Sequence, residues 1–363
     1  FLPNLDQLFQ PLDSDSHGVT ILAEASFISS ADEHWRNKIL ERLKTLHNSD
    51  SSYIRMCVLN SFPYLIDAQV DIEHLIETLL IPSFSDNDFK IRCLATKIAT
   101  IVGQPFFSNS QWLHLYLQTS DDESWNVRFS LALNMKLAIP NVDNPSLFAS
   151  HLIKLTKDPV DQIRALSLSV LTDTIEFFPE ESLSEIPVIF NNSMHSQIEE
   201  IRTSGIHLWA SLLKHHPNAP FQANLLNTLD LINFLPIESL IYSMLNLVVP
   251  LVPHQNLNLK TIENGINTLI GSVSPYWKQK GISIIIHYST IPFLHDLARI
   301  MAESILHLFD STCFSLRCAI GQMIVQLSVD ISWDWFNEKA LNLITDGIET
   351  GSCYVRMSLT RTI

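Results

Sequence analysis

The side chains best placed for chemistry in this sequence are an acid and a base that stand six positions apart and recur along the chain. The clearest copy is the run Asp122-Glu123-Ser124-Trp125-Asn126-Val127-Arg128. Other copies have Asp, Ser or Thr first and Arg or Lys second: Ser49/Arg55, Asp86/Arg92, Asp158/Arg164, Ser196/Arg202, Ser274/Lys280, Ser311/Arg317 and Thr350/Arg356. A guanidinium can donate paired hydrogen bonds to a carboxylate or to a phosphate. The pattern therefore allows either a ladder of internal ion pairs or a column of arginines that binds phosphate.

The charge of the chain favours the internal ladder. The sequence has 23 Lys and Arg against 38 Asp and Glu, a formal net charge of −15. Phosphate and nucleic-acid binding need clustered bases, whereas each base here has an acid or a hydroxyl six residues before it. We expect each base to reach the neighbouring unit's Asp and the turn carbonyls. The structural ladder residues are then Asp86, Arg92, Asp122, Arg128, Asp158, Arg164, Arg202 and Arg317.

The spacing of these pairs predicts the architecture. Successive bases stand 36–39 residues apart, with one gap of 78 between Arg202 and Lys280. A period of this length with only helical patterns is typical of stacked helical hairpins. The chain has only 9 glycines in 363 residues, which argues against a turn-rich sheet fold. We predict an all-α solenoid of about ten hairpins, with the acid in the turn and the base in the second helix.

The ends and the middle of the array depart from the regular unit. In the seventh unit Leu235 and Ile241 stand where the acid and base belong. The apolar pattern is already present at Phe1, and the tenth unit stops at Ile363, partway along its second helix. Neither end shows the polar cap that a solenoid needs. We therefore expect residues 1–363 to form one solenoid that is truncated at both ends.

Aromatic residues at the expected turns are candidates for contact with partners. Four stand three positions before the base and two stand two positions before it: Phe89, Trp125, Trp277, Phe314, Tyr53 and Tyr354. Aligned turns would display them as a ridge along one edge, and exposed aromatic residues on rigid turns are favoured at protein interfaces. The alternative is that each ring packs on the neighbouring turn. The other tryptophans, Trp35, Trp112, Trp209, Trp333 and Trp335, fall within helical patterns and are predicted to be core.

The unit resembles the HEAT repeat, an armadillo-type helical hairpin with Asp and Arg at this separation. Within that class, Asp122 to Arg128 is similar to the Asp-x-x-Trp-Arg-Val-Arg segment of the protein phosphatase 2A scaffold (A) subunit family, and the next unit, Leu155 to Ala165, resembles its following repeat. The resemblance covers residues 72–216. Asn126 replaces the family's usual Arg, and about ten of its fifteen repeats are present.

That resemblance implies a non-catalytic scaffold whose intra-repeat turns bridge a Ser/Thr phosphatase catalytic subunit and a regulatory subunit. The alternative is an importin-β-like HEAT transport receptor, because an acidic solenoid suits basic cargo. Either function would place the protein in the cytoplasm, and a nuclear location in addition is left open.

Catalytic and cofactor motifs are not found in the sequence. It contains no GxGxxG, GxxxxGK[ST], GxSxG or HExxH. The five cysteines are odd in number and include no CxxC pair, so we expect small buried thiols rather than a disulfide framework or a zinc site. The most apolar stretch, Leu240 to Val252, contains Pro250 and is too short for a membrane span, so it is predicted to be a core helix. We expect no catalytic residue, cofactor, metal, nucleic acid, membrane or small-molecule substrate.

Overall fold

A computed structural model describes residues 33–67, 71–217, 237–252 and 257–349, and no strand occurs within these ranges. They belong to two compact units, residues 1–185 and residues 186–363. The predicted all-α class is confirmed. The prediction of one array over the whole chain remains a prediction.

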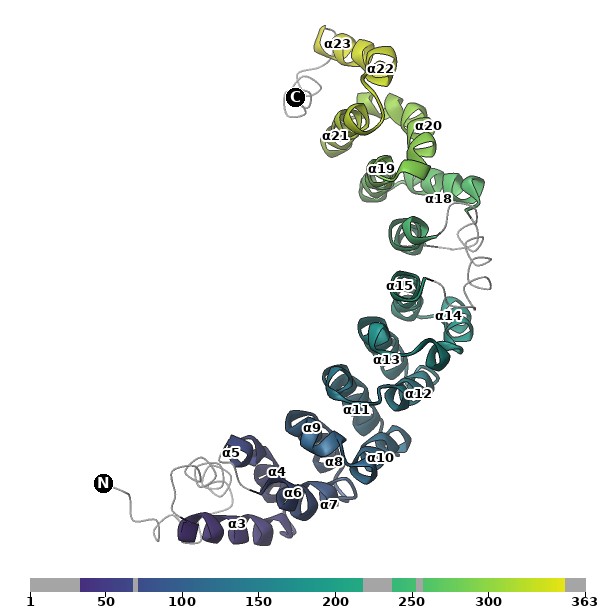
Figure 1. The fold of residues 1–363 in the computed structure, drawn as a ribbon. Helices are drawn as coiled ribbons and strands as arrows, with labels where there is room; N and C mark the ends of the chain where they lie inside the picture. The colour runs from purple at the N-terminus through teal and green to yellow at the C-terminus, as the bar shows by residue number, and fades with distance from the viewer. Residues whose placement is uncertain (1–32, 68–70, 218–236, 253–256, 350–363) are drawn as a thin grey trace, which may run out of the picture. The chain divides into compact units, whose positions relative to one another are not determined.

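Each unit is a series of helices joined by short turns (Figure 1). In unit 1 the helices are α3 (Glu33–His47), α4 (Ser52–Asn60), α5 (Phe62–Asp67), α6 (Ile72–Leu75), α7 (Ile81–Ser83), α8 (Phe89–Val102), α9 (Gln104–Phe107), α10 (Ser110–Gln118), α11 (Trp125–Ala138), α12 (Ser146–Leu155) and α13 (Asp161–Thr174). In unit 2 they are α14 (Ile186–Met194), α15 (Glu199–His215), α17 (Glu238–Ser243), α18 (Leu259–Gly271), α19 (Pro275–Ser289), α20 (His295–Ile305), α21 (Phe314–Asp330), α22 (Trp333–Trp335) and α23 (Leu341–Glu349).

The helices form hairpins whose second members pack on one another in chain order. In unit 1 α4 contacts α8, α8 contacts α11, and α11 contacts α13. In unit 2 the corresponding series is α15, α17, α19 and α21. First helices such as α12, α14, α18 and α20 pack against the second helix of their own hairpin. This stacking of neighbours is the arrangement that the 37-residue period predicts.

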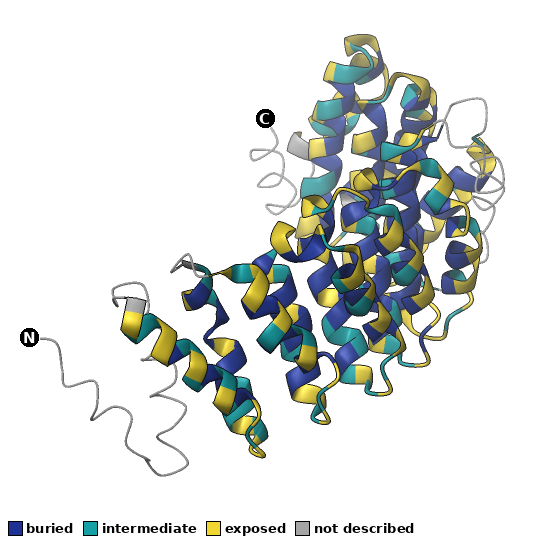
Figure 2. Ribbon diagram, turned by 60° about the horizontal axis from the view of Figure 1, so that its bottom comes forward, coloured by how far each residue is buried: buried dark blue, intermediate teal, exposed yellow. Residues whose placement is uncertain are grey.

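Buried residues gather where the helices face each other, and exposed residues lie on the outward sides of the helices (Figure 2). In α21 Leu316, Ile320, Met323 and Leu327 are all buried, as their three- and four-residue steps predict. In α8 the buried face includes Ile91 and Ile98, but Ile101 is 46% exposed. Residues 238–251 form one helical segment, with a wider turn at Met244–Val248, and most of its apolar side chains are buried. Among the described helices, none combines the length and apolarity that a membrane crossing requires.

The tryptophan predictions are confirmed in part. Trp209 is fully buried and packs on Phe190, with ring centres 4.7 Å apart. Trp335 is 5% exposed. The prediction of Trp333 as core is wrong, because it is 64% exposed. It is the first residue of α22 and contacts Phe336 edge-on instead of pointing into the core.

The hairpin of α14 and α15 requires a glycine where the two helices meet. A Cβ on Gly205 would lie 1.9 Å from the hydroxyl of Ser193, which is buried in α14. Gly205→Ala should therefore destabilise the protein by about 1–3 kcal/mol through overpacking. Thermal unfolding followed by circular dichroism measures the effect.

Gly271 at the end of α18 is the matched control, because a Cβ there meets nothing within 4 Å. Gly271→Ala should leave the melting temperature unchanged or raise it slightly. Equal effects of the two substitutions would contradict the close contact of α14 with α15.

Candidate functional site

Bidentate ion pairs join the second helices of neighbouring hairpins in unit 1. In each, an arginine one turn into a second helix donates from Nε and Nη2 to the two carboxylate oxygens of an Asp in the next turn. The three rungs and their distances are Arg55 to Asp86 (2.7 and 2.9 Å), Arg92 to Asp122 (2.7 and 2.8 Å) and Arg128 to Asp158 (2.6 and 3.1 Å). Their side chains are at most 15% exposed. The predicted ladder is present across these hairpins.

The third bond of each arginine explains the six-residue spacing. Nη1 of Arg92 donates to the carbonyl of Asp86, 2.8 Å away and six residues earlier in the same hairpin. The same bond occurs at Arg55, Arg128, Arg164, Arg202 and Arg317. One guanidinium therefore closes its own turn and, in the rungs, also holds the next turn.

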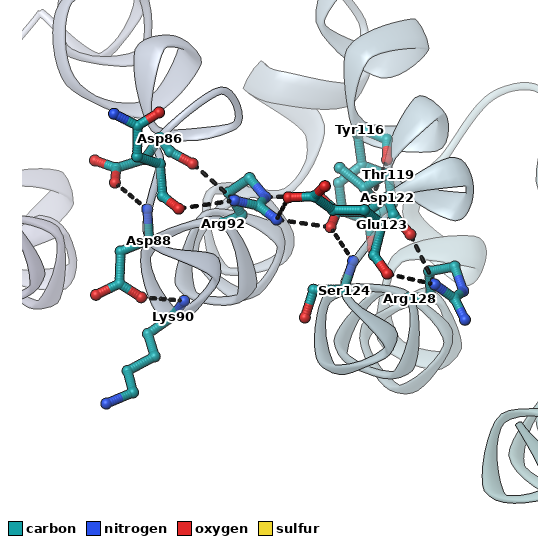
Figure 3. A network of polar contacts seen from close by, with 11 residues as sticks. Asp86, Asp88, Lys90, Arg92, Tyr116, Thr119, Asp122, Glu123, Ser124 and Arg128 are labelled. Atoms are coloured by element: carbon teal, nitrogen blue, oxygen red, sulfur yellow. Dashed lines mark hydrogen bonds and ion pairs between the residues drawn. The ribbon is translucent and has the colours of Figure 1, made fainter.

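The acid of each rung folds the turn before the second helix and does not cap that helix. Asp122 accepts the backbone N–H of Ser124 at 2.8 Å, and Ser124 is itself the N-cap residue of α11 (Figure 3). Asp86 and Asp158 accept the N–H two residues later in the same way. The carboxylate thus folds the turn just before the helix, because its side chain mimics a backbone acceptor. Both carboxylate oxygens remain available to the preceding arginine.

The electrostatics of a rung favour the charged forms of both partners. Burial raises the pKa of Asp86, but the hydrogen bonds from Arg55 and from the N–H of Asp88 outweigh burial and hold that pKa below its ordinary value. Hydrogen bonding to their Asp partners raises the pKa of Arg55, Arg92 and Arg128. These rungs are ion pairs at neutral pH.

The ladder changes after α13. Arg164 pairs with Asp161 in its own helix. In unit 2 Arg202 and Arg317 each bond a turn carbonyl at 2.5 Å. These two bonds close the arginines' own turns, and the predicted contact of Arg202 and Arg317 with a neighbouring unit stays a prediction.

In the eighth unit, the sequence pattern placed the hydroxyl and the base two residues too far along the chain. The hydroxyl of Ser272 accepts the N–H of Ser274, and α19 begins at Pro275. The base one turn into that helix is thus Lys278, not Lys280. Ser272 also donates to Glu238 of α17 at 3.1 Å. The contact between these two hairpins is therefore a hydrogen bond from a hydroxyl to a carboxylate.

Aromatic side chains project from the turns of unit 1, which the ladder aligns. Phe89 and Trp125 are the first residues of α8 and α11, and Tyr53 is the second residue of α4. They are 36%, 48% and 46% exposed, respectively. Trp125 contacts Phe129 of its own helix at a ring distance of 6.4 Å. The three rings thus present exposed surface at one edge of successive hairpins.

The remaining predicted aromatic residues are placed differently. Phe314 is the first residue of α21 and is 38% exposed. Trp277 does not lie at a turn tip, because the corrected frame makes it the third residue of α19, where it is partly buried beside Tyr276 and Tyr242. Tyr354 lies outside the described residues.

Acidic residues stand next to the exposed rings, which we had not identified as part of the site. Each turn of unit 1 carries a carboxylate outside the rungs, and Glu123 beside Trp125 is 91% exposed. Together these residues define the turn edge: Asp50, Tyr53, Asp88, Phe89, Glu123 and Trp125. Lys90 is the one lysine in the first turns of α4, α8, α11 and α13. Acids one to three positions before the aromatic residues were the available signal.

Metal ligands and reactive thiols are two further kinds of candidate site. Within the described ranges, no three His, Cys, Asp or Glu side chains are grouped so as to hold a metal ion. Burial raises the pKa of the Cys93 thiol to about 11, so this cysteine is protonated at neutral pH. The prediction of small buried thiols holds for Cys57, whereas Cys93, Cys313 and Cys318 are half-buried.

The comparisons with solved structures identify the fold. The karyopherin Kap121p bound to Ste12p matches with a TM-score of 0.67 at 12% identity, over 98% of this chain and 44% of that one. Kap121p bound to the extreme C-terminus of the phosphatase Cdc14p matches with a TM-score of 0.66 at 12% identity, over 98% of this chain and 44% of that one. Kap95p, from a study of its binding to RanGDP, matches with a TM-score of 0.63 at 12% identity, over 99% of this chain and 50% of that one.

These structures confirm the HEAT-repeat solenoid fold, and the chain spans half or less of each of them. No protein-family model matches the sequence, and no curated protein matches it. These findings do not support the match to a phosphatase 2A scaffold, and what they show is the fold.

Breaking a rung should be much more costly than breaking a surface pair, and adjacent aspartates test this. Asp122→Ala leaves the Arg92 guanidinium buried without its carboxylate, so the free energy of unfolding should fall by about 3 kcal/mol. Asp121→Ala removes only the exposed pair with Lys154 and should cost about 1 kcal/mol or less. Urea unfolding followed by circular dichroism compares the two, and equal losses would show that the ladder does not stabilise the stack.

The lowered pKa of Asp86 predicts a stability change with pH. Because its pKa is lower in the folded than in the unfolded chain, its contribution is complete above the unfolded value of about 3.9. The contribution is lost as the pH falls through the lower folded pKa. Asp86→Asn should therefore reduce the slope of stability against pH below about 4, in urea melts between pH 2.5 and 6. An unchanged slope would contradict the ionised rung.

Proposed function

We propose that this chain binds extended basic segments of other proteins along the turn edge of unit 1, as a transport receptor of the importin type. The observation that carries the proposal is the row of exposed aromatic residues with a carboxylate beside each. Aromatic faces and carboxylates both attract Lys and Arg side chains. The ladder neutralises its own arginines, so the edge presents acidic groups with Lys90 as the exception.

The spacing of the hairpins specifies the form of the ligand. Packed helices lie about 8–10 Å apart, so successive aromatic residues should repeat at about that distance. An extended chain advances about 3.3–3.6 Å per residue. A basic side chain at every third position of an extended segment would therefore meet Tyr53, Phe89 and Trp125 in turn.

The comparisons support transport over the phosphatase scaffold. The matched karyopherins are described as bound to Ste12p, to the C-terminus of Cdc14p and to RanGTP, which are protein partners. Their likeness to this chain is in fold, and the charge of the turn edge is this chain's own feature. Basic cargo and localisation to the cytoplasm and nucleus are parts of this proposal.

Peptide binding tests the proposal directly. A labelled peptide with lysine at every third position should bind more tightly than one of equal composition with its lysines grouped. The double variant Phe89→Ala, Trp125→Ala should weaken binding by at least about fivefold, because removing an interface anchor typically costs more than 1 kcal/mol. Fluorescence anisotropy at 50 and 150 mM salt measures affinity and its electrostatic part.

Leu137→Ala is the matched control, since Leu137 is 63% exposed on α11 but lies far from the turn. It should leave binding unchanged. Binding to GTP-loaded Ran would separate a transport receptor from another basic-peptide receptor. Capture of a phosphatase catalytic subunit through Trp125, with no affinity for either peptide, would replace this proposal with the scaffold function.

A further inference from the structure

A groove in unit 2 lies between two second helices, α19 and α21. Its volume is about 490 Å³, and its lining includes Tyr276, Gln279 and Lys280 from α19 and Phe314, Cys318 and Gln322 from α21. Along α19 the lining runs from Tyr276 to Ile286, which is about 15 Å of helix. An extended segment of four or five residues has that length.

The chemistry of the walls suits a peptide backbone and one apolar side chain. Tyr276 and Phe314, at the helix starts, are 55% and 38% exposed. Gln279 and Gln322 contribute side-chain amides, one from each helix. Among the described residues, neither amide is hydrogen-bonded to another protein group. Amides can donate to and accept from a peptide unit.

The charge of the groove is opposite to that of the turn edge. Its lining contains one charged residue, Lys280, and no carboxylate. The sequence has no Asp or Glu from 272 to 295 or from 311 to 329, although the chain has 38 acids in 363 residues. Carboxylates near these helices are engaged elsewhere: Glu238 accepts from Ser272, and Asp330, at the far end of α21, accepts from Ser289 and Gln326.

The lysine is held in place at the groove wall. Its Nζ lies 5.1 Å from the ring centre of Tyr242 and 5.4 Å from that of Tyr276. Such cation–π contacts restrict the side chain while leaving its charge unneutralised. Lys278 adds a second cation in the same helix.

We infer that this groove binds a short, extended acidic segment of a partner protein. An apolar side chain of the segment sits between Tyr276 and Phe314, its carboxylates pair with Lys280, and its backbone bonds the two glutamine amides. The site is separate from the turn edge and does not depend on the function proposed for that edge.

Three labelled peptides with the same central residue test this inference with the full chain: Glu-Asp-Phe-Asp-Glu, Gln-Asn-Phe-Asn-Gln and Lys-Arg-Phe-Lys-Arg. Fluorescence anisotropy should show the acidic peptide binding most tightly. Lys280→Glu should weaken it by at least about fivefold, because it replaces attraction by repulsion. Lys214→Glu, the same charge change at an exposed site on α15, should have little effect. Ser283→Trp, at an exposed position in the lining, should block the groove without altering the core.

Cysteine labelling locates the bound peptide. Cys318 lines the groove, whereas Cys93 lies in unit 1. The acidic peptide should slow alkylation of Cys318 by iodoacetamide, measured by peptide mass spectrometry, and leave Cys93 unchanged. The Phe89→Ala, Trp125→Ala variant should bind the acidic peptide normally. Equal affinity of Lys280→Glu and Lys214→Glu for that peptide, tighter binding of the neutral or basic peptide, or unprotected Cys318 at saturation would overturn the inference.

Discussion

The structure of unit 1 depends on one interaction, the arginine that closes its own turn and holds the next. A guanidinium has five donors in a fixed plane, and here one nitrogen bonds the turn carbonyl while two others bond a carboxylate. Burial makes this geometry important, because an unpaired charge at such a position would be costly. The same Asp also folds the turn through the N–H two residues later. Each rung thus fixes a turn and the register between two hairpins at once, and this alignment places Tyr53, Phe89 and Trp125 in one row.

The rungs could be predicted from the sequence because each arginine has two kinds of partner at fixed spacings: a turn carbonyl six residues earlier and an Asp about one hairpin later. The six-residue separation is the distance from a turn carbonyl to the first turn of a helix, and the hairpin period carries the acid to the next arginine. Where two spacings fit the pattern, the sequence-based assignment was wrong. Ser272 and Ser274 both precede a lysine by six residues, and only the helix start at Pro275 selects the first. The exposure of Trp333 was also missed, since helical periodicity does not show which side of a short helix faces the core.

The proposed sites were less accessible to sequence reasoning than the fold. The segment Asp122 to Arg128 resembles a phosphatase scaffold, but the structure gives most of its residues structural tasks: Asp122 and Arg128 form rungs, Ser124 is the N-cap residue of α11, and Val127 is fully buried. Such a match identifies the repeat and carries little information about a partner. The groove between α19 and α21 has no motif at all, since its walls come from two helices whose pairing only the structure shows.

The positions that the ladder leaves unconstrained decide what each face of the protein can bind. Because every rung is internally neutral, the field at the surface comes from the residues between the rungs. In unit 1 these include Asp50, Asp88 and Glu123, whereas the first turn of α19 has Lys278, that of α21 has Arg317, and neither has an acid. At physiological ionic strength charges are screened beyond about 8 Å, so each site interacts mainly with its local charges and not with the net charge of −15. One repeat scaffold can therefore present an acidic edge in one unit and a basic groove in the other.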